Sequence, residues 1–308
     1  MHLVQNFETM KLPTLTEKFG SHKCAVCGSV KTKLSLDLSM PYMGSSETYE
    51  LWKCLDCGHG ETFGRRDEEF LQQIYGSFFF SSSQQNTCSP SSSININARE
   101  RIIWLSQIGK GKLLDVGCGK GAFLAAASKH FVVEGVEFSK VAAEAASAQG
   151  IPIHCGDFFQ LELPHEEFDV VTFWDVFASL DNPSDAMSRV RPILKDNGHL
   201  ILTVPLLDSI MARVMGRFWP MLIPPINLHY FTQDSLCRLA ASKGFEVISI
   251  TREGKMVSLD FIALKLCRSL RLKKIFHTWA AKLPPKPIRV NTRDLATVVL
   301  KVDERQLS

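Results

Sequence analysis

The sequence predicts an α/β protein, with a doubly wound, mostly parallel Rossmann-like sheet and a small N-terminal zinc ribbon. Two observations support this fold class. From Lys112 onward, short apolar segments alternate with Ala-rich segments, which is typical of a parallel sheet covered by helices on both faces. Before them, two Cys-x-x-Cys-Gly sequences begin at Cys24 and Cys54, and this pairing is typical of a four-cysteine metal site.

The individual elements follow from the apolar runs and from helix start and stop signals. We expect strands at 112–116, 132–137, 151–155, 168–174 and 199–204, with further strands at 245–251 and 296–302. Helices are expected at 97–108, 123–130, 140–149, 184–194 and 233–243. The sequence Asp196-Asn197-Gly198 predicts a tight turn into the fifth strand.

Composition and spacing divide the chain into three parts. Residues 1–65 are expected to form the zinc-ribbon module, and residues 66–98 a linker or lid, because the serine-rich part of this stretch cannot bury enough surface to order itself. Residues 99–308 are expected to form the ligand-binding α/β domain, with a C-terminal amphipathic insert. A chain of 308 residues is long enough for one full-sized core and a smaller module.

Charge and composition exclude some classes of protein. Hydrophobic residues make up 45% of the chain and charged residues 22%, which is the balance of a globular protein with a sizeable core. The formal net charge of +3 is too small to indicate nucleic-acid binding. Without a secretory signal or a long apolar run, we expect a cytoplasmic protein, in which the nine cysteines are thiols or metal ligands.

The two cysteine pairs carry the strongest metal signal. Each Cys-x-x-Cys-Gly sequence presents two sulfurs on one side of a tight turn, so Cys24, Cys27, Cys54 and Cys57 can complete a tetrahedral shell. We expect structural Zn²⁺, because four thiolates leave no open position. Redox-active pairs and simply buried thiols are the alternatives.

A glycine-rich turn follows the first predicted strand of the α/β domain. Asp115 is followed by Gly117, Gly119 and Gly121, and glycine lets the backbone approach a ligand at the carboxyl end of a strand. Gly117, Gly119 and Ala122 also satisfy the dinucleotide fingerprint, so these residues alone leave a hydride-transfer enzyme open.

Over residues 95–250 the sequence resembles the class I S-adenosylmethionine-dependent methyltransferase family. Asp115 and the three glycines match its D-x-G-x-G-x-G motif, and Glu137 is placed to accept the ribose hydroxyls. Gly156-Asp157, the strand that begins at Phe168, and Gly198 follow in the family's order. The resemblance implies that S-adenosylmethionine is the cofactor, and it adds these binding residues: Phe138, Asp157, Phe158, Trp174 and Asp175.

The four-cysteine module together with His229-Tyr230-Phe231-Thr232 resembles a bacterial branch of this family associated with cell-envelope glycans and deoxysugars. That resemblance implies a small or lipid-linked sugar, or a similar metabolite, as methyl acceptor. The chain departs from it at Ala178-Ser179, where related enzymes often carry Glu-His. This departure leaves a divergent, non-catalytic binding protein open.

Methyl transfer to a hydroxyl or carbon acid requires a base that removes a proton. His229 follows the fifth strand on the expected ligand edge and is the candidate base; Tyr230 is a second candidate and Tyr75 a third. A histidine that only hydrogen-bonds across its loop is the alternative for His229.

Two segments combine apolar and basic residues, 206–223 and 264–283. We expect them to pack on the core, and peripheral contact with an anionic membrane or lipid-linked substrate is the alternative. An RNA methyltransferase that reads RNA with the ribbon is a further alternative, although the ribbon carries few basic and aromatic residues. Nucleic acid is therefore not the expected partner.

Overall fold

The computed structural model describes residues 19–20, 22–42, 45–73, 92–105, 108–269, 274–280 and 282–303. Tyr75, the third candidate base, and most of the expected linker at 66–98 lie outside these residues. In the part that the structure describes, no helix has the length and apolar character needed to cross a bilayer.

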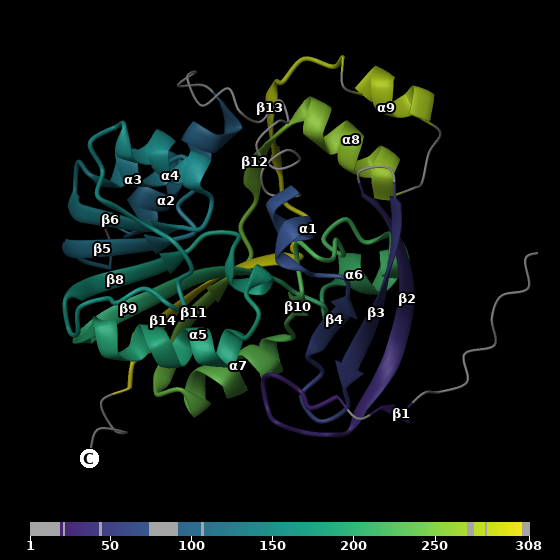
Figure 1. Cartoon of the computed structure of the whole chain (residues 1–308), viewed down its shortest axis with the longest axis horizontal. Helices are drawn as coiled ribbons and strands as arrows, with labels where there is room; N and C mark the ends of the chain where they lie inside the picture. The colour runs from purple at the N-terminus through teal and green to yellow at the C-terminus, as the bar shows by residue number, and fades with distance from the viewer. Residues whose placement is uncertain are drawn as a thin grey trace, which may run out of the picture.

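The larger unit is a seven-stranded sheet in the order β11-β14-β9-β8-β5-β6-β7 (Figure 1). β5 to β9 run parallel, whereas β14 is antiparallel to both β9 and β11. The strand order reverses at β5, and this topological switch point is where open α/β sheets bind ligands. The strands are β5 (Gly111–Val116), β6 (Phe131–Glu137), β7 (Ile153–Cys155), β8 (Phe168–Phe173), β9 (Leu194–Pro205), β11 (Phe245–Thr251) and β14 (Leu295–Val302).

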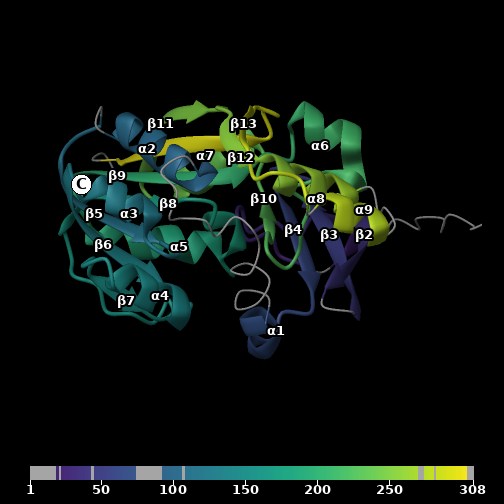
Figure 2. The same cartoon turned by 90° about the horizontal axis from the view of Figure 1, so that it is seen from above.

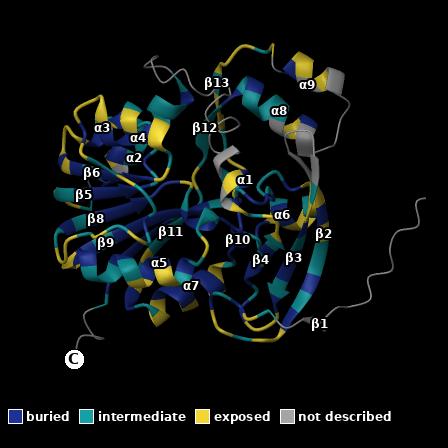
Figure 3. Cartoon of the chain, in the orientation of Figure 1, coloured by how far each residue is buried: buried dark blue, intermediate teal, exposed yellow. Residues whose placement is uncertain are grey.

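Helices cover both faces of this sheet, which confirms the predicted α/β class (Figures 1 and 3). Alternate strand residues face opposite sides, so Leu113 packs in one core and Leu114 in the other. The first face carries α2 (Ser93–Leu105), α3 (Ala122–Ala127) and α4 (Lys140–Ser147); the second carries α5 (Pro183–Val190) and α7 (Gln233–Ser242).

One predicted turn is wrong. Asp196, Asn197 and Gly198 lie within β9, which begins directly after a 3₁₀ turn at Arg191–Ile193. β9 pairs with β8 at both ends of this stretch, Leu194 with Phe168 and His199 with Val170, so residues 195–198 bulge opposite Asp169. The bulge keeps both strands paired, and the Lys195 ammonium donates to the Asp169 carboxylate at 2.8 Å.

The N-terminal module is an antiparallel sheet whose last strand belongs, by its position in the sequence, to the larger unit. Its order is β1-β2-β3-β4-β10, where β10 (His229–Tyr230) pairs with the edge of β4. The two sheets therefore lie side by side in both views (Figures 1 and 2). The other strands are β1 (Phe19–Gly20), β2 (Thr32–Tyr42), β3 (Ser45–Cys54) and β4 (Gly60–Gly64), followed by α1 (Glu68–Gln73).

The segment at 206–223 packs against this antiparallel sheet, as the core-packing expectation proposed. It contains α6 (Ile210–Met215) and a 3₁₀ turn at Gly216–Phe218. Trp219 and Leu222 are buried against Tyr49 and Leu51 of β3. Ile210 and Val214 on α6 remain exposed, with 82% and 79% of their surface accessible.

The C-terminal part adds a two-stranded sheet and two helices. β12 (Lys255–Ser258) pairs with β13 (Pro287–Val290), and α2 packs beside them through Asn97, which hydrogen-bonds Met256 twice. The helices are α8 (Leu259–Ser269) and α9 (Lys274–Ala280). Trp279 on α9 is 63% exposed, so this end of the amphipathic segment is not covered.

Candidate cofactor site and four-cysteine cluster

The turn between β5 and α3 has the backbone that only glycine adopts freely. Gly117, Gly119 and Gly121 have φ values of 76°, 56° and 79°. A Cβ on Gly117 would lie 2.5 Å from the Val176 side chain, whereas a Cβ on Gly119 would meet nothing within 4 Å. The turn therefore packs closely on the protein at Gly117 and leaves open space above Gly119, where a ligand can approach the backbone.

Glu137 ends β6 beside this turn and is held by two backbone donors. The Gly119 and Ser139 N–H groups donate to its two carboxylate oxygens at 2.8 Å each. Burial raises the pKa of Glu137, although these N–H donors oppose that rise. Each oxygen keeps a further lone pair, so the fixed carboxylate can accept hydroxyl groups of a ribose.

Asp115 is the buried carboxyl of the site. It is 2% exposed, accepts the Thr172 hydroxyl at 2.7 Å, and its pKa is raised by burial to about 7. Trp174, at the end of β8, has a buried indole N–H without a partner in the described structure. A buried carboxyl and an unpaired donor at neighbouring strand ends are unfavourable unless a polar ligand contacts them.

Asp175 directly follows and adopts a strained backbone, with φ at 62°. Its N–H donates to the Thr203 hydroxyl at 2.6 Å. Arg101 from α2 and Lys255 from β12 pair with its carboxylate at 2.9 and 3.2 Å. Burial opposes ionisation, but the two cations hold the pKa of Asp175 far below its usual value.

Two cations of this site, Arg101 and Lys255, are not predicted by any pattern in the sequence. The Arg101 guanidinium lies 4.5 Å above the Trp174 ring and also pairs with Asp175. Neither cation belongs to a motif, and they come from distant parts of the chain, α2 and β12. Only the packing of α2 beside β12 brings them to the same strand end.

The remaining predicted cofactor residues occupy neighbouring positions. Phe138 follows β6 and is 50% exposed, as a stacking surface requires. Asp157 follows β7 and accepts the Phe159 N–H at 3.0 Å in a tight turn. Phe158 is 4% exposed and packs on Phe173, so its ring belongs to the core beneath this edge.

His229 and Tyr230 lie in β10, and their side chains face the protein interior. His229 has no exposed surface; its Nδ1 lies 3.1 Å from His59 Nε2 and its Nε2 lies 3.2 Å from the Asp181 carbonyl. Burial lowers the pKa of His229 to about 3, and the Arg66 charge acts in the same direction. The buried Tyr230 hydroxyl donates to the Asn227 carbonyl at 2.9 Å. The structure thus groups His229 with His59 of the N-terminal module.

The four predicted metal ligands come together at one end of that module. Cys24 and Cys57 have their sulfurs 3.7 Å apart, and Cys27 and Cys54 3.5 Å apart. Four thiolates around zinc at about 2.3 Å would lie about 3.8 Å from one another, so the cluster has the spacing of a tetrahedral metal site. It is a group able to hold a metal ion.

The two cysteine turns have matching backbones, which explains the glycine that ends each. The Gly28 N–H donates to the Cys24 carbonyl at 2.9 Å, and the Gly58 N–H to the Cys54 carbonyl at 3.1 Å. Both glycines have positive φ, 72° and 73°. Cys24, Cys54 and Cys57 are also part of the main hydrophobic core, which joins the module to the large sheet.

Fold and site together define an α/β protein that binds a nucleotide-type cofactor at the switch point of its sheet. A family profile described as "Methyltransferase domain" matches residues 96–250. The chain therefore belongs to the class I S-adenosylmethionine-dependent methyltransferase family, and it is an enzyme of that kind.

Individual relatives are distant. The chain is 30% identical over 108 residues to the uncharacterized protein MJ1123 of Methanocaldococcus jannaschii, which covers 35% of this chain and 51% of that protein. It is 27% identical over 156 residues to a ubiquinone biosynthesis O-methyltransferase of Coxiella burnetii, covering 46% of this chain and 67% of the enzyme.

The fold is also found among solved structures. One, titled "Conversion of a Disulfide Bond into a Thioacetal Group during Echinomycin Biosynthesis", matches with a TM-score of 0.52 and 17% identity, and the match covers 77% of this chain and 93% of that chain. At this identity the likeness shows the shared fold.

Proposed function

We propose that this enzyme transfers the methyl group of S-adenosylmethionine to a small metabolite, with a sugar or lipid-linked sugar as the acceptor class. The observation that carries the cofactor half is the glycine turn beside a fixed Glu137 and a buried Asp115. The unpaired Trp174 N–H and the open space above Gly119 fit a bound polar cofactor.

Each residue of the site has a defined task in this proposal. The cofactor supplies an electrophilic methyl group on a positively charged sulfur. Glu137 would hold the ribose hydroxyls, and Asp115 would face the cationic methionine half, which favours its ionised form. Phe138, Asp157 and Phe158 would form the adenine side, with Phe158 acting from the core beneath the edge.

Asp175, Arg101 and Lys255 form a charged group at the end of β8. Opposite charges close together keep all three ionised and fix the orientation of the Asp175 carboxylate. We assign this group to the methionine half of the cofactor, where a carboxylate and cations can meet its amino and carboxylate groups.

The part of the proposal that concerns the methyl acceptor has less support than the part that concerns the cofactor. The O-methyltransferase of Coxiella burnetii favours oxygen as the methylated atom. His229 and Tyr230 remain predictions as catalytic residues: the low pKa of His229 makes it a weak base, and both side chains are buried away from solvent. The cytoplasmic location and membrane contact through 206–223 and 264–283 also remain predictions.

We further propose that the four cysteines hold structural Zn²⁺. The sulfur spacing and the absence of a free ligand position among the four support a closed thiolate site. No step of methyl transfer depends on this ion.

Titration calorimetry with S-adenosylmethionine tests the cofactor assignment. Binding to the full chain is expected, and Glu137→Ala should weaken it at least about tenfold, because two charge-assisted contacts are lost. Glu162→Ala, a carboxylate on the loop between β7 and β8, is the matched control and should bind like the natural sequence. No binding by the folded natural chain would contradict the proposed function.

A further inference from the structure

We propose that His59, Glu61 and His229 form a second metal site, which holds a divalent cation and ties the N-terminal module to the methyltransferase domain. One potential ligand atom from each residue lies within 4.8 Å of those of the other two. The donor set of two imidazoles and one carboxylate is one that zinc accepts.

Strand pairing brings the three side chains together. Glu61 in β4 stands directly opposite His229 in β10, and side chains directly opposite each other in a sheet point to the same side. His59 lies just before β4, two positions ahead of Glu61, and its Nε2 approaches His229 Nδ1. The register of two short strands thus assembles a site from residues 170 positions apart.

The two imidazoles have the spacing of ligands that share an ion. His59 Nε2 and His229 Nδ1 lie 3.1 Å apart, and two nitrogens bound tetrahedrally to zinc at about 2.0–2.1 Å lie about 3.3 Å apart. Both side chains are almost fully buried, at 1% and 0% exposure. A cation between them would use both lone pairs, whereas a hydrogen bond uses only one.

The outer contact of His229 suits metal ligation. Its Nε2 lies 3.2 Å from the Asp181 carbonyl, so Nε2 carries the proton and Nδ1 presents a lone pair toward His59. Imidazole ligands of metals commonly donate their second N–H to a carbonyl in this way. The ring orientation needed for binding is therefore already fixed by the loop after β8.

Glu61 supplies the negative charge. Among the described residues, no Lys or Arg forms an ion pair with it, and the residue opposite it in the sheet is the buried His229. A partly buried carboxylate without a cation is unfavourable, and a divalent ion would compensate its charge. Four thiolates around Zn²⁺ would leave two negative charges nearby, which adds to the attraction for a second cation.

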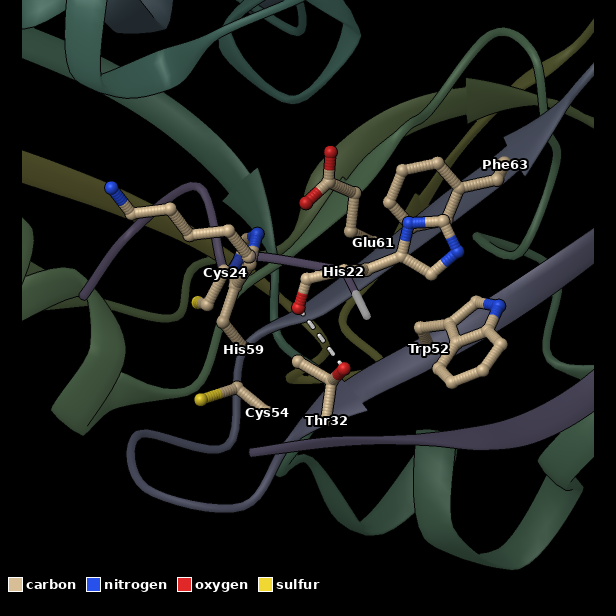
Figure 4. A pocket seen from close by; sticks show the side chains of 9 residues that line it. His22, Cys24, Thr32, Trp52, Cys54, His59, Glu61 and Phe63 are labelled. Carbon is tan, nitrogen blue, oxygen red and sulfur yellow. Dashed lines mark hydrogen bonds between the residues drawn. The ribbon is translucent and has the colours of Figure 1, made fainter. Parts of the chain in front are cut away.

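A small cavity lies beside His59 and Glu61 (Figure 4). It measures about 10 Å³, enough for one water molecule, and His59 and Glu61 line it together with Cys24 and Cys54. His59 Nδ1 is buried and has no partner in the described structure, so a water molecule there would satisfy it. The second site is therefore distinct from the four-cysteine cluster but adjoins it.

Cobalt titration of the full, metal-depleted chain tests this inference. We expect two equivalents of Co²⁺: one with the intense thiolate charge-transfer absorption of a four-cysteine site, and one that adds only weak bands of nitrogen and oxygen ligands. Glu61→Gln and His229→Asn should each reduce the total to one equivalent and keep the thiolate absorption. His154→Asn is the matched control, because His154 also contacts a glutamate, Glu134, at 3.0 Å, and it should retain two equivalents.

The outcomes separate the two metal proposals. One equivalent in the natural chain, with full thiolate absorption, would overturn the second site and leave the four-cysteine site standing. Two equivalents in Glu61→Gln and in His229→Asn would also overturn it. If the natural chain titrated with Co²⁺ shows no thiolate absorption, that result would count against the four-cysteine site instead. The natural chain decides the stoichiometry even if a variant fails to fold.

Discussion

At the scale of single residues, burial determines how the carboxyls of the cofactor site behave. Asp115 is almost inaccessible, and its carboxyl accepts the Thr172 hydroxyl. Its carboxyl is favoured in the neutral form when no cofactor is bound, because the pKa of Asp115 is raised by burial to about 7. The folded chain therefore loses stability as pH rises from the unfolded pKa of 3.8 to about 7, and the loss is complete above pH 7.

Asp115→Asn should remove this pH dependence. Between pH 6 and pH 8, the stability of the variant relative to the natural chain should rise by about 1 kcal/mol. In this interval Asp115 is fully ionised in the unfolded natural chain but only partly ionised in the folded one, so the natural chain loses stability as the pH rises. Urea unfolding of both chains without cofactor at the two pH values measures it. Asp196→Asn, at an exposed position in β9, should show no such change. An equal difference for Asp115→Asn at both pH values would refute the assignment.

At the scale of elements, α7 connects the cofactor domain to the cysteine module. Thr232 caps this helix: its hydroxyl accepts the Ser235 N–H at 3.0 Å and donates to the Cys57 carbonyl at 2.9 Å. Ser209 caps α6 by accepting the Ala212 N–H at 3.1 Å. The two caps therefore differ by one contact to the second cysteine turn.

Thr232→Val should destabilise the chain by about 2 kcal/mol, from the lost cap and the lost bond to Cys57. Ser209→Ala, which loses its cap alone, should cost about 1 kcal/mol. Urea unfolding monitored by circular dichroism gives both values. Equal costs would mean that the Cys57 contact contributes nothing to stability.

The elements also show how far sequence patterns reach. The strand at 245–251 was predicted at its observed bounds, and the strands around the glycine turn within one or two residues, because each has its own apolar run. β10 was not predicted, since two residues carry no period; its pairing with β4 depends on tertiary contacts. The residues predicted as a turn at 196–198 instead form a bulge within β9, without a partner on β8, while the pairs on either side keep the two strands together.

The same limit applies to the candidate site. Asp115, Gly117 and Glu137 could be predicted because they lie at the carboxyl ends of β5 and β6, which meet at one edge of the sheet. Arg101, Lys255 and His59 could not, because no local pattern marks them and packing alone brings them to their partners.

At the scale of the whole molecule, the cysteine module and the cofactor domain share one core. Cys24, Cys54 and Cys57 pack in the same cluster as Phe231 and Leu236. Arg66, just after β4, donates to the Ser179 carbonyl at 2.7 Å in the loop after β8. If the four cysteines hold zinc as proposed, its removal should therefore destabilise the whole chain.

Calorimetry of the full chain should show one unfolding transition, both with zinc and after chelation. Chelation should lower its midpoint by at least on the order of 10 °C, because metal binding contributes to folding. Cys237→Ser changes a cysteine outside the cluster and should leave the zinc-loaded midpoint nearly unchanged. Two separate transitions would show that the module and the domain unfold independently.

The pairing of β10 with β4 has a consequence for exchanging parts between enzymes. A graft of residues 22–64 alone would leave the edge of β4 without its neighbour and the apolar surface of β3 without Trp219 and Leu222. A transplantable unit must combine this sheet with residues 206–231, two stretches separated by the cofactor-binding strands. Any chimera that exchanges this module would thus need two coordinated replacements.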